Sequence, residues 1–97
     1  MYGIAIIRYR KPLEEVQQAT EEHRAYLRML KQAGILVVSG TLDPRYGGAA
    51  VFRLPDEGAD AALAALRDGD PYVKRGLAQW EIWNWVPVIG KEDLDRV

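Results

Sequence analysis

The sequence predicts an α+β fold of the ferredoxin-like type, in which four antiparallel strands carry two helices on one face. The first observation behind this prediction is the order β-α-β-β-α-β, read from apolar β-branched runs and from segments of helical periodicity. The second is that the expected strands are apolar on both faces, whereas two helices cover only one. An uncovered apolar face of that size indicates a partner sheet, so we expect a two-fold homodimer packed sheet to sheet.

The individual elements follow from the local pattern of each segment. Short runs rich in Val, Ile, Tyr and Trp predict strands at residues 2–9, 35–40, 49–54 and 77–88. Helical spacing predicts helices at 13–34 and 59–67, and a separate helical turn at 70–76. We therefore expect one domain over residues 1–90, followed by a charged tail at 91–97 that has no packing signal.

The expected helix at 13–34 has the clearest pattern in the chain. Its inward stripe follows steps of three and four residues: Leu13, Val16, Thr20, His23, Leu27 and Leu30. Pro12 suits its start, Lys31 lies in its last turn, and Gly34 suits its end. The only histidine of the chain is therefore expected on the buried side of a helix.

Composition excludes several classes of function. The chain has 97 residues, with 13 basic and 14 acidic side chains and a net charge of −1, which argues against a nucleic-acid partner. With no cysteine and one histidine, we expect neither a disulfide nor a metal site. No apolar run is long enough to span a membrane, and the first run has the pattern of a strand rather than of a signal peptide. We expect a cytoplasmic protein that uses no cofactor.

His23 and Asp70 are the candidate chemical groups, and each has a structural alternative. A lone histidine on an apolar stripe is more often a core residue with satisfied hydrogen bonds than a catalyst. Asp70 precedes Pro71 and opens a helical turn, so it is also a natural N-cap. The two roles are compatible, because one carboxylate oxygen can cap the turn while the other faces an imidazole. Such a carboxylate would leave the second ring nitrogen free to accept a proton.

Aromatic and basic side chains offer further contacts for a ligand. Trp83 and Trp85 share one face of the last strand and Trp80 lies on the other, and packing accounts for them better than an aromatic pocket does. Tyr72 either lines a pocket or packs its own turn. Three scattered arginines are either ligands for an anionic substrate or solvated surface residues: Arg8, Arg45 and Arg75.

Four segments of the chain resemble the YciI-like (YCII-related) family of small proteins: HRAYLRML, AGILVVSGT, GDPYVKRGL and QWEIWNWVPV. The resemblance extends to about Val88. It implies a dimeric α/β barrel, and it implies a His-Asp pair as the active site, with the histidine at His23 and the aspartate at Asp70. The chain departs from many relatives at Gly40-Thr41, where they have Gly-Pro. A dehydrochlorinase that acts on chlorinated aromatic compounds carries this domain.

The resemblance and the residue inventory together favour an enzyme that acts on a small, partly aromatic substrate. His23 would transfer a proton while Asp70 orients it, in an elimination or an isomerisation. Ser39 and Tyr72 are the candidate substrate-binding residues. One alternative is a non-catalytic domain for ligand binding or assembly, in which His23 is structural. Haem binding through His23 is a third possibility, because some barrels of the wider superfamily bind haem.

Overall fold

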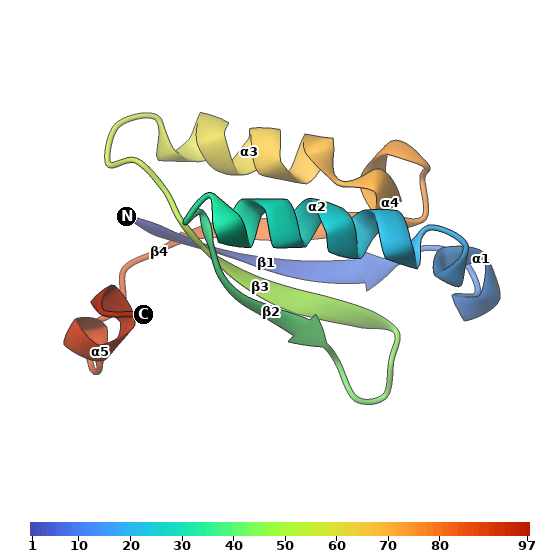
Figure 1. Cartoon of the computed structure of the whole chain (residues 1–97), viewed down its shortest axis with the longest axis horizontal. Coiled ribbons are helices and arrows are strands. Elements are labelled where there is room, and N and C mark those ends of the chain that lie inside the picture. The colour runs from blue at the N-terminus through green and yellow to red at the C-terminus, as the bar shows by residue number, and fades with distance from the viewer.

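A computed structural model describes all residues, 1–97, and folds them into one antiparallel sheet with two long helices on one face (Figure 1). The strands are β1 (Tyr2–Tyr9), β2 (Leu36–Thr41), β3 (Gly47–Arg53) and β4 (Ala78–Trp85), in the order β2-β3-β1-β4. The helices are α1 (Leu13–Gln17), α2 (Thr20–Gln32), α3 (Ala59–Gly69), α4 (Pro71–Lys74) and α5 (Lys91–Asp95). The predicted ferredoxin-like α+β fold is confirmed.

The core lies between the sheet and the pair α2 and α3. Successive side chains of a strand point to opposite faces, so Ala5 and Ile7 of β1 point toward the helices together with Phe52 and Trp80 of the neighbouring strands. All four are at least nine-tenths buried. This packing fixes the register of β1, because a shift by one residue would turn its buried side chains to the open face.

The helix expected at 13–34 is in fact two helices, and the prediction of one continuous helix is wrong. The amides of Gln18 and Ala19 bond to the carbonyls of Glu15 and Val16, three residues back, which is a tight turn rather than a continued α-helix. The turn buries both Val16 and Ala19 completely. At this turn the chain changes direction, and α1 runs at an angle to α2 (Figure 1).

Residues 91–97, expected as a tail without packing, form α5 and contact the end of the sheet. The Tyr2 hydroxyl donates to Oδ1 of Asp95 at 2.5 Å, and the Arg53 guanidinium bonds to the backbone oxygen of Val97. Lys91 and the Tyr2 hydroxyl hold the pKa of Asp95 below its usual value. These contacts are polar and join distant parts of the sequence, so a pattern of apolar residues could not predict them.

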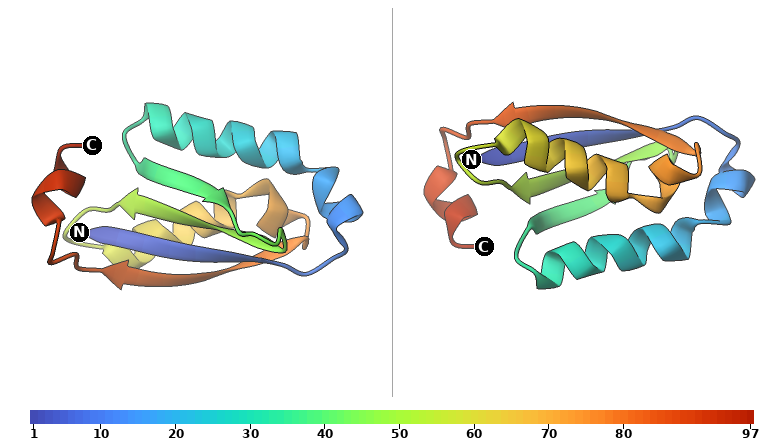
Figure 2. Two further views of the ribbon diagram at one scale, coloured as in Figure 1. Left: turned by 90° about the horizontal axis from the view of Figure 1, so that it is seen from below. Right: turned by 90° about the horizontal axis from the view of Figure 1, so that it is seen from above.

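The second face of the sheet is apolar and uncovered. Val38, Val51, Ile4 and Trp83 form one row across all four strands, on the side opposite the fully buried Ala5. Viewed from that side, no helix lies in front of the strands (Figure 2). Val38 is 59% exposed and Trp83 is 49% exposed. No helix of the chain has the length and apolar character needed to cross a membrane.

Candidate functional site

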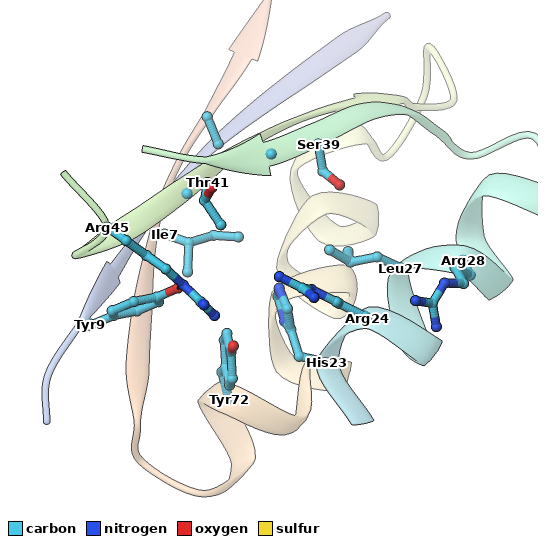
Figure 3. Close-up of a pocket in the computed structure, with 13 residues that line it drawn as sticks. Ile7, Tyr9, His23, Arg24, Leu27, Arg28, Ser39, Thr41, Arg45 and Tyr72 are labelled. Atoms are coloured by element: carbon cyan, nitrogen blue, oxygen red, sulfur yellow. The ribbon is translucent and has the colours of Figure 1, made fainter. Parts of the chain in front are cut away.

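A pocket of about 390 Å³ lies on the helix side of the sheet (Figure 3). Its walls come from the first two turns and the middle of α2, the ends of β1 and β2, the loop before β3 and the start of β3, and α4. Ile7, Leu27 and Ala49 supply apolar surface, Tyr9 and Tyr72 supply aromatic rings, and most of the other lining residues are polar or basic. The pocket is within the size range of small-molecule sites.

His23 and Asp70, 47 residues apart in the sequence, meet behind this pocket. Nδ1 of His23 lies 2.7 Å from Oδ1 of Asp70. Asp70 is completely buried, whereas His23 lines the pocket and is 9% exposed. The other ring nitrogen, Nε2, has no hydrogen-bond partner in the chain, and no buried side-chain nitrogen or oxygen lacks one, so Nε2 faces the pocket. The chain thus presents one imidazole nitrogen to a ligand and ties the other to a carboxyl group.

Three donors hold the Asp70 carboxyl group. Oδ1 accepts from the backbone amide of Tyr72 at 3.1 Å as well as from His23, so one oxygen both caps α4 and meets the imidazole. The expectation of one role for each oxygen is therefore wrong. Oδ2 instead accepts from the indole N–H of Trp80 at 2.8 Å. Neither an amide nor an indole N–H can accept a hydrogen bond, so this environment suits the carboxylate form.

Tyr72 packs its ring flat against His23. The ring centroids are 3.9 Å apart and the planes differ by 11°. The phenol oxygen lies 2.8 Å from Oγ1 of Thr20, and burial raises the pKa of Tyr72. Tyr72 therefore lines the pocket and also fixes the plane of the imidazole.

Ser39 and Arg45 also reach the pocket, whereas Arg8 and Arg75 do not. Ser39 points into it from β2 (Figure 3). Arg45 enters from the loop after β2 and donates from Nε to the Tyr9 hydroxyl at 3.3 Å. This bond raises the pKa of Arg45. Arg8 and Arg75 instead form ion pairs at the surface, with Glu81 and Glu22, so they are not ligand contacts of this pocket.

Sequence reasoning missed several polar residues of this site, Tyr9 and Thr41 among them. Arg24 and Arg28 line the pocket from α2, and Trp80 anchors Asp70 from β4. The spacing of Thr20, His23, Arg24 and Leu27 along a helix contained a signal for Arg24, because these positions share one side. No local pattern distinguishes an indole that donates to a buried carboxylate from one that only packs.

Trp80→Phe should lower the free energy of unfolding by about 2 kcal/mol, since it removes a charge-assisted hydrogen bond and keeps most of the ring packing. Urea denaturation followed by circular dichroism measures this change. Trp85→Phe is the matched control, because Trp85 is 39% exposed and donates no hydrogen bond within the chain. Equal losses in the two variants would mean that the indole–carboxylate bond contributes nothing.

The fold and the pocket define a ferredoxin-like α+β protein with a ligand-sized cavity beside its helices. The chain belongs to the YCII-related domain family, whose family model matches residues 2–86. No curated protein matches the sequence. A solved structure with the same fold is that of 5-chloro-2-hydroxyhydroquinone dehydrochlorinase (TftG) from Burkholderia phenoliruptrix AC1100, in complex with 2,5-dihydroxybenzoquinone. The TM-score is 0.71 at 20% sequence identity, and the match covers 91% of this chain and 96% of that chain.

Proposed function

We propose that this YCII-related protein is an enzyme in which His23 and Asp70 transfer a proton on a small, partly aromatic substrate. One observation carries the proposal: Nδ1 of His23 is bonded to buried Asp70 at 2.7 Å, while Nε2 faces a pocket of about 390 Å³. A histidine that only filled the core would have both nitrogens satisfied by the protein, or one of them turned to bulk solvent away from any cavity.

The protonation states follow from the partners. A carboxylate only accepts hydrogen bonds, so Nδ1 of His23 carries the hydrogen and Nε2 of the neutral ring is a proton acceptor. When Nε2 takes a proton from the substrate, the ring becomes a cation beside the Asp70 carboxylate, which stabilises it. General acid–base catalysis of this kind contributes about 10²–10⁴-fold in rate. The stack on Tyr72 holds the ring in position during the transfer.

The inventory of the pocket favours elimination or isomerisation over hydrolysis through a covalent intermediate. Ser39 is the pocket's serine, and it makes no hydrogen bond to His23 that would activate it as a nucleophile. A single base suffices for removal of a proton followed by its return at another atom, or by loss of a leaving group. Ser39 and Tyr72 then serve as contacts for the substrate. The dehydrochlorinase of the same fold makes hydroxylated, chlorinated rings the first compounds to test.

His23→Gln should lower turnover by at least about 100-fold, because the amide cannot serve as a base. Release of chloride from 5-chloro-2-hydroxyhydroquinone and uptake of deuterium from heavy water by the ring carbons of 2,5-dihydroxybenzoquinone are the two assays. Glutamine fills a similar volume, so the melting temperature should change by only a few degrees.

The opposite pattern identifies the non-catalytic alternative. In that case the unchanged protein catalyses neither reaction, and His23→Gln mainly lowers the melting temperature. Unaltered deuterium uptake in the variant would also contradict the proposal, since the exchange would then need no imidazole.

We further infer that the protein is a homodimer with the open faces of two sheets packed together. Support comes from the apolar row of Ile4, Val38, Val51 and Trp83, which has no cover within the chain. A two-fold axis through this face would bring the same row of each copy together, as an isologous interface requires. No helix lies over this side of the sheet (Figure 2).

A further inference from the structure

Positive charge is concentrated around the pocket, and no acidic side chain lines it. Arg24, Arg28 and Arg45 are three of its thirteen lining residues, and none of the thirteen is Asp or Glu. The chain as a whole has a net charge of −1, so the pocket departs in sign from the rest of the molecule. A cavity lined by one sign of charge attracts ligands of the opposite sign.

The three pocket arginines have no carboxylate side chain as a partner within the chain, as is also true of Arg10 and Arg53 outside the pocket. Four other arginines are paired with Asp or Glu within the chain: Arg8, Arg67, Arg75 and Arg96. Arg24, Arg28 and Arg45 form no ion pair, although the chain has 14 acidic residues. Three guanidinium groups without a carboxylate partner thus line one cavity.

Arg45 is fixed in place and still has free donors. It is half-buried, and it donates from Nε to the Tyr9 hydroxyl at 3.3 Å and from Nη2 to Oγ1 of Thr20 at 3.5 Å. A guanidinium has five N–H groups, so three remain for a ligand. Both partners are neutral hydroxyls, which orient the guanidinium without neutralising it. The fork geometry that remains matches a carboxylate or another oxyanion.

This cation lies close to the proposed base. Thr20 connects them, because its hydroxyl contacts Arg45 on one side and the Tyr72 phenol on the other, and the Tyr72 ring stacks on His23. Arg24 follows His23 directly on α2 and turns toward the same space (Figure 3). A ligand at Nε2 of His23 therefore lies among guanidinium groups.

We propose that the substrate is a small organic anion whose oxyanion binds Arg45, with Arg24 adding charge at the rim and Ile7 and Leu27 contacting its apolar part. The inference rests on the proposed function in one respect only, namely that the proton which His23 removes belongs to this anion. The guanidinium groups then stabilise the negative charge that grows on the substrate as the proton leaves. A neutral compound of the same shape would leave these cations without a partner.

The test compares an anion with its neutral counterpart in the full-length protein. By calorimetry at low salt, 2,5-dihydroxybenzoquinone, which is anionic at neutral pH, should bind, and its neutral dimethyl ether should bind at least about tenfold more weakly. Arg45→Gln should weaken binding of the anion by at least about tenfold. Arg75→Gln removes the same charge outside the pocket and should leave the affinity within about twofold.

Several outcomes overturn the inference. One is equal affinity for the anion and its ether; another is an equal effect of Arg45→Gln and Arg75→Gln. Absence of saturable binding by 2,5-dihydroxybenzoquinone, benzoate and phenyl phosphate up to millimolar concentration is a third. His23→Gln separates this inference from the proton-transfer proposal, because it should abolish deuterium uptake and retain binding of the anion. Loss of the Arg45 effect alone refutes the substrate class, whereas unchanged exchange in His23→Gln alone refutes the role of the base.

Discussion

Asp70→Asn should destabilise the protein by about 3 kcal/mol, which is the usual range for breaking a buried charged pair by changing one partner. The carboxylate is completely buried and faces three N–H donors, from His23, Tyr72 and Trp80. An asparagine amide has one oxygen and one NH2 group. Whichever way it turns, the NH2 group meets a backbone amide or an indole that also only donates. Urea denaturation at neutral pH measures the loss.

The same variant should also lower turnover by about 10³–10⁴-fold, because the asparagine no longer keeps the ring hydrogen of His23 on Nδ1. If the asparagine NH2 group donates to Nδ1, the ring hydrogen moves to Nε2, and the nitrogen that faces the pocket no longer accepts a proton. Deuterium uptake into 2,5-dihydroxybenzoquinone, measured below the unfolding transition, reports this effect separately from stability.

Asp68→Asn is the matched control for both measurements. The Asp68 side chain lies two residues away, is 65% exposed and pairs with Arg67 at the surface. Its replacement should change the free energy of unfolding by no more than about 0.5 kcal/mol. Coincident unfolding curves for Asp70→Asn and the unchanged protein would refute the account of the anchored carboxylate.

Local sequence patterns locate His23 and Asp70 on their elements, but they do not predict the contact between the two side chains. The position of His23 on the buried side of a helix and the N-cap at Asp70 follow from patterns within a few residues, and both residues lie where those patterns predict. The contact between them depends on the packing of α2 against α4, and the spacing along the chain does not encode it. The indole of Trp80 completes the group from a third element, so only the folded chain reveals it.

The ion-pair partners of the arginines also depend on the fold and could not be predicted from the sequence. From composition alone, Arg8, Arg45 and Arg75 were equivalent candidates for an anion. The fold places a glutamate beside Arg8 and another beside Arg75, and it places hydroxyls beside Arg45. Whether a guanidinium has a partner is a tertiary property. The break between α1 and α2 was missed for a related reason, because the apolar stripe continues through the turn in step with a single helix.

Trp83→Glu should convert the proposed dimer into a monomer. The side chain is 49% exposed in the single chain and stands in the apolar row across the open face. Buried tryptophans at interfaces typically contribute 2 kcal/mol or more, and a two-fold dimer contains the change twice, so the loss is about 4 kcal/mol, or about a thousandfold in Kd. Light scattering at micromolar concentration measures the mass directly.

Met29→Glu provides the control, because Met29 is 54% exposed and lies on α2, on the other side of the sheet. It introduces the same charge in place of a large apolar side chain and should leave the mass unchanged. A monomeric unchanged protein, or a dimeric Trp83→Glu variant, would contradict pairing through the open face. The pocket opens on the helix side of the sheet, opposite the face that carries Trp83, so the monomeric variant should still bind 2,5-dihydroxybenzoquinone. If the monomeric variant lost binding as well, the second copy would be shaping the pocket, through the strands that form both the pocket wall and the open face.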